Sequence, residues 1–171
     1  MGVETEPKNW YRDEFLLSTE RSLLQVDAIH EAMGSEVMWW AQAIPKDALL
    51  EALRNSLSFG LYELPESTSQ IAGQGGPKQI GFMRVITDNV TFAYLTDVYV
   101  LPKYQGKGLG RWMLNCLKEV IKAWPHLRRF MLLTSSRSID LYKETIAAND
   151  WVEGEGGLAI GMIKGPGAVS H

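Results

Sequence analysis

The sequence predicts an α+β fold with three layers, in which helices cover the faces of a mixed sheet. Strand-like segments rich in β-branched residues are interspersed with segments of helical periodicity, in the order β, two helices, three strands, helix, strand, helix, strands. The length of 171 residues suits a single domain over residues 1–171, and the 46% hydrophobic and 22% charged content is ordinary for a globular protein.

The first half predicts one short strand, two helices and a further strand. The strand is "YRDEFLLST", and Ser18 and Thr19 are suitable N-cap residues for a helix over "ERSLLQVDAIHEAM". Pro45 opens a second helix, "PKDALLEALRNSL", before the strand "SFGLYEL". Residues 65–78 are polar and rich in turn formers, which indicates a flexible loop.

The second half begins with two strands, "QIGFMRVITD" and "TFAYLTDVYVL", joined tightly at Asn89 and therefore expected to be an antiparallel pair. The segment "GRWMLNCLKEVIKAW" has one apolar face and predicts a helix that Pro125 ends. A buried strand "RRFMLLTS", a short helix "SRSIDLYKETIAAN" and two strands within "WVEGEGGLAIGMIK" follow. Residues 165–171 are expected to be a frayed tail.

Composition and charge exclude several functional classes. The net charge of −3 gives no basic field for nucleic acid or an anionic membrane. Cys116 is the only cysteine, so no internal disulfide forms, which suits a reducing compartment. No apolar run approaches the ~20 residues that span a bilayer, and the N-terminus lacks the pattern of a signal peptide. We expect a soluble cytoplasmic protein without a metal site.

The stretch "VLPKYQGKGLGRWM" carries the strongest functional signal. Pro102 ends a strand, and glycines stand at positions 106, 108 and 110, where a helix begins. A helix N-terminus has unpaired amides and a partial positive charge, and glycines let an anion approach them. Lys107 and Arg111 add positive charge, so a diphosphate would suit this site. The plainer alternative is a loop whose glycines serve only to allow positive φ. The glycine spacing does not match that of a Walker loop or of a dinucleotide-binding fingerprint.

The segment "QGKGLG" fits the pattern Gln/Arg-x-x-Gly-x-Gly/Ala of the pyrophosphate loop in the GNAT superfamily of N-acetyltransferases. With "DVYVLP" before it, "LYKE" after it and the order of elements, nearly the whole chain resembles this family. The resemblance implies a mixed, mostly antiparallel sheet of six to seven strands flanked by about four helices. It also implies acetyl-CoA as co-substrate and direct acetyl transfer to a primary amine of a small molecule or peptide.

The resemblance assigns roles to individual residues. Tyr142 stands where the family places its general acid. A bulge near Asp97–Tyr99 would splay two strands to admit the pantetheine arm, and an amide near Val98 would stabilise the oxyanion. Asp97 either removes a proton from the amine or orients the backbone or a substrate ammonium; Thr96 replaces a carboxylate found in many members. The implied cofactor-binding residues are Val98, Tyr99, Val100, Gln105, Gly106, Lys107, Gly108, Leu109, Gly110 and Arg111.

Several residues depart from the family pattern or have a structural explanation. Ser135 replaces a common asparagine, and the segment after Tyr142 is longer than usual. Cys116 is expected to pack in the core, and His30 to lie on the surface or cap a helix. We expect at least one of Trp39 and Trp40 to pack in the core, although one of them could line an acceptor pocket.

Two other functions stay open: a non-catalytic module that binds CoA or acyl-CoA and regulates a partner, and a protein acetyltransferase that works within a complex. The sequence also leaves open the acceptor amine, the acyl-chain preference and whether the chain forms a homodimer.

Overall fold

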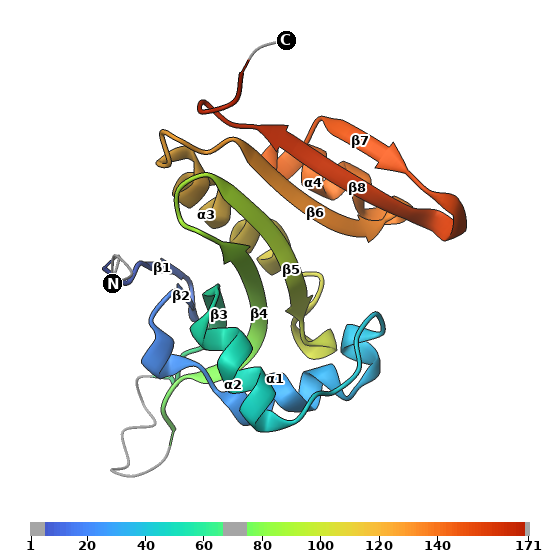
Figure 1. Ribbon diagram of the computed structural model, residues 1–171. Helices are drawn as coiled ribbons and strands as arrows, with labels where there is room; N and C mark the ends of the chain where they lie inside the picture. Colours follow the sequence, from blue (N-terminus) through green and yellow to red (C-terminus); the bar gives the residue numbers. More distant parts are fainter. Residues whose placement is uncertain (1–5, 67–74, 170–171) are drawn as a thin grey trace. The chain divides into compact units, whose positions relative to one another are not determined.

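The computed structural model describes residues 6–66 and 75–169 (Figure 1). The chain forms two compact units. The first comprises Met1–Met83 and Tyr99–Tyr104, and the second comprises Arg84–Val98 and Gln105–His171. Two strands, β4 (Lys78–Thr87) and β5 (Phe92–Val100), contribute residues to both units. Within the described residues the strand order is β1-β2-β3-β4-β5-β6-β8-β7.

The first unit starts with two strands where the sequence predicts one. Asp13 has a positive φ of 51°, which turns the chain between β1 (Asn9–Arg12) and β2 (Phe15–Ser18). These strands pair antiparallel, and β2 pairs with β3 (Leu57–Glu63) in the same way. The expected six to seven strands are therefore eight among the described residues.

Helices α1 (Val26–Met33) and α2 (Lys46–Arg54) form the helical part of the first unit. The predicted start of α1 is wrong: Gln25 is its N-cap, whereas Ser18 is fully buried at the end of β2. The cause is a separate 3-10 turn over Arg21–Leu23, which the Glu20 side chain caps. Apolar residues of both helices form one core cluster with one residue of the 3-10 turn Glu36–Met38 and two strand residues; its buried members are Ile29, Ala32, Met33, Met38, Leu49, Leu53, Phe82 and Tyr99.

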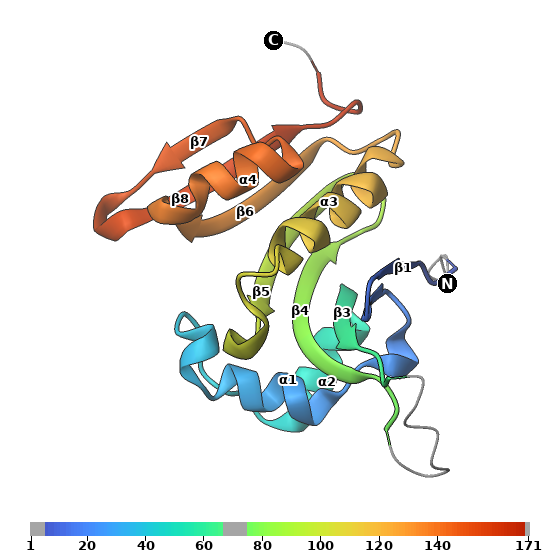
Figure 2. The ribbon, with the colours of Figure 1, turned by 180° about the vertical axis from the view of Figure 1, so that it is seen from behind.

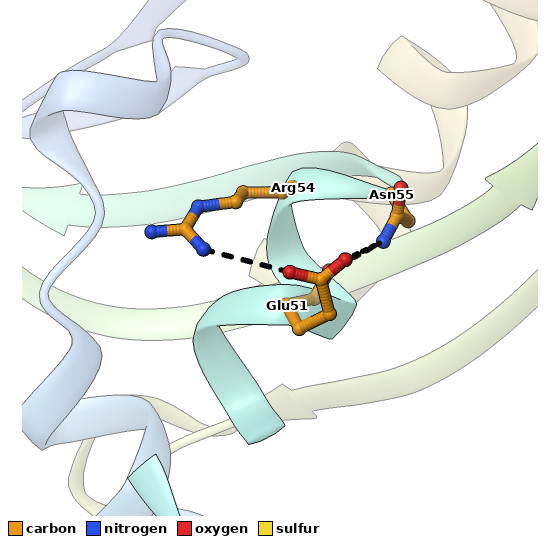
Figure 3. A network of polar contacts seen from close by, with 3 residues as sticks. All are labelled: Glu51, Arg54 and Asn55. Carbon is orange, nitrogen blue, oxygen red and sulfur yellow. Dashed lines mark hydrogen bonds and ion pairs between the residues drawn. The ribbon is translucent and has the colours of Figure 1, made fainter. Parts of the chain in front are cut away.

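The end of α2 is held by a local polar network (Figure 3). The Asn55 side-chain amide donates to the Glu51 carbonyl at 2.9 Å and to the Glu51 carboxylate at 2.8 Å. Arg54 contacts the other oxygen of that carboxylate at 3.5 Å. Because these groups satisfy a carbonyl of the last turn, the helix ends at Arg54 and the chain enters β3.

The second unit contains two helices and three further strands besides its parts of β4 and β5. Their bounds are α3 Leu109–Lys122, β6 Arg129–Ser135, α4 Ile139–Ile146, β7 Asp150–Glu153 and β8 Leu158–Lys164. β5 pairs parallel with β6, whereas β8 pairs antiparallel with both β6 and β7. The predicted mixed, mostly antiparallel sheet with four helices is thus confirmed.

One face of the strands in the second unit is covered by helices. Figure 2 shows α4 lying over β6 and β8, with α3 beside it. On this face Phe130, Leu132 and Ala159 are almost completely buried. The indole of Trp151 lies across Gly161, where a Cβ would come within 2.7 Å of the ring. The predicted buried strand is thus buried on this face, whereas Leu133 on the other face is 50% exposed.

The sequence predicts two irregular segments, a loop over residues 65–78 and a tail over residues 165–171. Residues 67–74 of the predicted loop lie outside the described residues, and Lys78 already begins β4. The start of the predicted tail is held by backbone hydrogen bonds. The Gly165 and Gly167 amides donate to the carbonyls of Arg128 and Leu127 at 3.2 and 2.9 Å. A side chain at either glycine would collide with that neighbouring backbone.

Candidate active site

The glycine loop leads into α3 with a left-handed turn. Gly106 and Gly108 have φ values of 81° and 73°, a region that other L-residues seldom adopt. Gly108 is the N-cap of α3, and the first helical hydrogen bond runs from the Trp112 amide to its carbonyl at 3.1 Å. The amides of Leu109, Gly110 and Arg111 precede that bond, so they are directed out of the end of the helix.

The N-terminus of α3 lacks the acidic groups that the other helices carry. The N-cap residue, Gly108, has no side chain with which to cap the helix, and the first turn contains no Asp or Glu. By contrast, α1, α2 and α4 carry Asp27, Asp47 and Asp140 in their first turns. The positive end of the α3 dipole is therefore not offset by a carboxylate from its own first turn, which favours an anion there.

Gly110 is the most informative of the three glycines. It lies within the first turn of α3, has ordinary helical backbone geometry, and a Cβ built on it meets no atom within 4 Å. Neither backbone strain nor packing in the protein requires glycine at this position. Since glycine in a helix is about 1 kcal/mol less favourable than alanine, the fold by itself does not account for glycine at this position.

β5 changes its backbone conformation at Asp97. The residue has φ of 55° within the strand. Pairing of β5 with β6 covers four residue pairs and ends at Leu95 with Leu132, whereas β6 continues beside β8 as far as Ser135. The strand therefore leaves its parallel partner just before the left-handed residue, which agrees with the bulge expected near Asp97–Tyr99.

Asp97 is paired with a residue that sequence reasoning missed. Arg84 Nε on β4 donates to Asp97 Oδ2 at 2.8 Å, and the two side chains are 16% and 9% exposed. The Thr96 hydroxyl lies 3.4 Å from the other carboxylate oxygen. The available sequence signal for Arg84 is that it is the single basic residue within the apolar run "IGFMRVIT". Its pairing with Asp97 could not be predicted, because it depends on the register between strands.

Tyr142 lies on α4 and is 8% exposed. Burial raises the pKa of its phenol above the usual value, because the charged phenolate is poorly solvated there, and a hydrogen bond with the Thr134 side chain partly opposes this. The phenol is therefore protonated at neutral pH and can act as a proton donor. Thr134, at the end of β6, was also missed from the sequence.

Arg111 forms an ion pair with Glu144, which is a third unpredicted partner. The Nη1 to Oε2 distance is 2.5 Å, and both side chains are about half exposed. Glu144 lies on α4, so the pair links this helix to the first turn of α3. An anion at the α3 N-terminus would share Arg111 with Glu144.

The other predicted cofactor-binding residues lie along the same stretch of chain. Tyr99 packs its ring against Phe82 in the first unit, with centroids 6.2 Å apart, so its side chain is occupied by the core. Val98 and Val100 are half-buried. Gln105 and Lys107 are exposed in the turn that precedes α3.

Of the residues with a predicted structural role, two agree with expectation. Cys116 is buried on α3, and burial raises the pKa of its thiol to about 12. His30 Nε2 contacts the Ile44 carbonyl at 2.9 Å. The expectation for the tryptophans is wrong: Trp39 and Trp40 are 68% and 44% exposed and pack edge-to-face on each other. They lie in the irregular segment between the first two helices, which lacks the regular structure that would direct one inward.

The described residues show neither a metal-binding cluster nor a helix suited to a membrane. No group of three or more His, Cys, Asp and Glu side chains in residues 6–66 and 75–169 is arranged to hold a metal ion. In the same ranges, no helix combines the length and apolar character that crossing a membrane requires.

Comparison with known proteins identifies relatives over most of the chain. The family model described as "Acetyltransferase (GNAT) family" matches residues 31–146. A Gibberella zeae protein named "Putative acetyltransferase FG08082" is 48% identical over 174 residues, covering 96% of this chain and 97% of that protein. Thialysine N-epsilon-acetyltransferase of Bos taurus is 40% identical over 65 residues, covering 37% of this chain and 38% of the relative.

Two solved structures show the same fold. A GNAT-family protein from Xanthomonas campestris pv. campestris has a TM-score of 0.59 and 33% identity, covering 78% of this chain and 84% of that protein. Spermidine N-acetyltransferase of Vibrio cholerae, solved in complex with CoA and spermine, has a TM-score of 0.61 at 17% identity, covering 90% of this chain and 96% of that protein. The sequence and family matches show that this chain belongs to the GNAT family of acetyltransferases.

Proposed function

We propose that this protein is an acetyl-CoA-dependent N-acetyltransferase that transfers an acetyl group directly to a primary amine of a small molecule or peptide. Membership of the acetyltransferase family supports the reaction class. Two relatives are named for amine substrates, thialysine in one case and spermidine in the other. Those names support an amine acceptor; the proposal for this chain rests on its own residues.

The observation that carries the proposal is Gly110. Its open space, ordinary backbone and place in the first turn of α3 fit a bound anion better than any need of the fold. The amides of Gly106 to Arg111, with the Lys107 and Arg111 side chains, would hold the pyrophosphate of CoA. The loop residues present therefore fit this co-substrate.

The end of β5 would hold the rest of the co-substrate. After Leu95 the strand is no longer paired with β6, so the backbone of Val98, Tyr99 and Val100 would pair with the pantetheine arm as with an extra strand. When bound, acetyl-CoA would supply the acetyl thioester and the thiolate leaving group. The Val98 amide would stabilise negative charge on the thioester oxygen.

Tyr142 would donate a proton to the departing thiolate. A thiol with a pKa of roughly 8.5 leaves more easily when it is protonated, and general acids of this kind contribute about 10²- to 10⁴-fold. The raised pKa of Tyr142 keeps the proton on the phenol at the start of the reaction. Thr134, hydrogen-bonded to the phenol, would fix its direction.

Asp97 would act as a positioning residue. One of its oxygens already accepts from Arg84, and its left-handed backbone lies where the bulge is expected. By holding the bulge, the ion pair would set the direction of the neighbouring Val98 amide. Deprotonation of the amine by Asp97 is the competing role, and the pH profile of an Asp97→Asn variant separates the two.

The test is thiol release from acetyl-CoA in the presence of a panel of amines, followed by mass spectrometry of the acetylated product. The panel contains lysine analogues, polyamines, arylalkylamines and peptides with free N-termini. We expect at least one amine to release thiol and gain an acetyl group. Tight CoA binding by calorimetry with no turnover on any class would instead favour a non-catalytic CoA-binding module, and no CoA binding would refute both.

A further inference from the structure

The positive end of α3 receives a carboxylate from the neighbouring helix. Arg111, in the first turn of α3, is ion-paired with Glu144 of α4, with 2.5 Å between Nη1 and Oε2. The two helices pack on each other within the second unit (Figure 2). Glu144 therefore brings to this helix end the negative charge that the first turn of α3 itself lacks.

The acidic groups of the helices α1, α2 and α4 stand in their own first turns. Asp27, Asp47 and Asp140 are fixed near the amides of these turns by their places in the chain. Glu144 differs, because it comes from another helix and its carboxylate ends a flexible side chain that rotation can withdraw from Arg111. The counter-charge at α3 is thus removable, which suits a helix end that also binds an anion from solution.

The ion pair lies where it is easily broken. The side chains of Arg111 and Glu144 are 53% and 57% exposed. Ion pairs at such exposure contribute little to stability, because water solvates the separated charges and salt screens their attraction. Buried residues hold α4 in place instead; they are Ile139, Tyr142, Thr145 and Ile146. The fold therefore does not depend on the pair, and a doubly charged anion can displace Glu144.

A diphosphate and the Glu144 carboxylate need the same guanidinium. Lys107 and Arg111 are the basic residues of the segment 105–111. The Arg111 donor that faces Glu144 is withheld from phosphate oxygens, and the carboxylate repels a diphosphate bound to the other side of the guanidinium. Both effects lower the affinity for any ligand that carries this group.

We propose that Glu144 is a positioning residue that competes with the diphosphate of acetyl-CoA for Arg111 and thereby keeps CoA binding weak enough for the product to leave. The proposal rests on the proposed function, in which this diphosphate binds at the N-terminus of α3. Acetyl-CoA and the product CoA carry the same diphosphate, so the competition weakens the binding of both by the same factor. A thioester without a diphosphate is unaffected.

The first test measures CoA binding to wild type and to Glu144→Gln by calorimetry at one salt concentration. We expect Kd to fall about 3- to 10-fold, because one exposed charge acts on a diphosphate with two charges. Glu153→Gln, at an exposed position on β7, makes the same chemical change and should leave Kd unaltered.

The sign of the effect decides between two roles of the carboxylate. If Glu144 instead held Arg111 ready for the anion, Glu144→Gln would weaken CoA binding, and that result overturns the proposal. An unchanged Kd overturns it as well, while CoA binding by the wild type leaves the proposed function standing. A wild type that binds no CoA overturns both.

The second test repeats the comparison in an Arg111→Gln background. Competition for Arg111 requires that Glu144→Gln tightens CoA binding much less once the arginine is gone, so the two substitutions are not additive. Equal tightening in both backgrounds would mean that Glu144 acts only through the overall charge of the site, which contradicts a contest for one side chain.

The third test uses turnover. In Glu144→Gln the KM for acetyl-CoA and the inhibition constant of product CoA should fall together, and kcat should not rise because CoA leaves more slowly. Acetyl-pantetheine, which lacks the diphosphate, should keep its wild-type kcat/KM. An equal change in kcat/KM for both thioesters, or a lowered melting temperature, would show that the substitution disturbs α4 itself and would refute the competition.

Discussion

Arg84 Nε lies 2.8 Å from Asp97 Oδ2, between neighbouring strands and at a residue with left-handed backbone geometry. Both side chains are largely withdrawn from solvent, at 16% and 9% exposure. Removing one partner of a buried ion pair leaves the other charge without compensation, which costs roughly 3–5 kcal/mol. The pair therefore couples the shape of β5 to the stability of the second unit.

Asp97→Asn should lower the free energy of unfolding by about 3 kcal/mol, and Arg84→Met by a similar amount. Urea unfolding of both single variants and of the double variant measures the coupling. The double variant should lose less free energy of unfolding than the two single losses added together. The exposed pair Lys46–Asp27, with an N to O distance of 2.6 Å, is the matched control, and Asp27→Asn should have little measurable effect. Additive losses at Arg84 and Asp97 would show that the pair is not coupled.

The same Asp97→Asn variant tests the role of the carboxylate. If Asp97 positions the bulge, turnover per folded molecule falls less than about 10-fold and the pH profile keeps its shape. Loss of about 100-fold or more, with disappearance of the acidic limb of the profile, would instead identify Asp97 as the general base. The kinetic measurements are made at a temperature below the midpoint of thermal unfolding of the variant.

Tyr142→Phe should lower kcat about 10- to 100-fold, because the thiolate then leaves without a proton. The ring still fills its site, so the melting temperature should change little. Tyr11→Phe, at a position 67% exposed, controls for loss of a hydroxyl elsewhere. Full activity of Tyr142→Phe with the true acceptor would remove Tyr142 from the proposed mechanism.

Burial predicts how the Tyr142 phenol titrates. Its folded-state pKa is raised above the unfolded value of roughly 10, mainly by desolvation. A raised pKa means that the stabilising contribution is fully present below pH ~10 and is lost as pH rises through the folded-state pKa. The absorbance titration of wild type minus that of Tyr142→Phe should show a phenol that ionises above pH ~10; ionisation near pH 9 would contradict the burial.

Gly110→Ala should separate stability from binding. The added methyl group meets no protein atom, and alanine is a better helix former, so the free energy of unfolding should stay constant or rise by up to about 1 kcal/mol. The KM for acetyl-CoA should nevertheless rise about 10-fold or more, because the methyl group blocks approach to the amides. Gly76→Ala, which also meets no atom, should leave KM unchanged. Unchanged KM in Gly110→Ala would argue against a phosphate at this position.

Cys116 should not react with thiol reagents in the folded protein at pH 8. Burial raises the pKa of its thiol to about 12, so little thiolate forms, and the side chain is 3% exposed. Labelling with a disulfide reagent should occur at one equivalent in urea and be slow in its absence. Rapid labelling without denaturant would contradict the packing of α3, and slow labelling leaves the thiol-release assay with a low background.

Much of the fold follows from local patterns in the chain. The apolar stripe of α3, the glycines before it and the order of helices and strands are properties of short segments, which is why they could be read without a structure. The missed boundary between β1 and β2 is also local, yet Asp13 is a residue that adopts positive φ only in some contexts, so its turn was not evident.

The candidate site likewise combines features that follow from local sequence with contacts that depend on the tertiary structure. The sequence alone determined the glycine loop before α3, because amides and glycines act through backbone positions that are adjacent in the chain, and it determined that Tyr142 follows on its own helix. Only the tertiary structure decided that Arg84 meets Asp97, that Thr134 meets Tyr142 and that Glu144 meets Arg111. These contacts join residues up to 33 positions apart, and they depend on strand register and helix packing, which are set by the burial of many side chains at once.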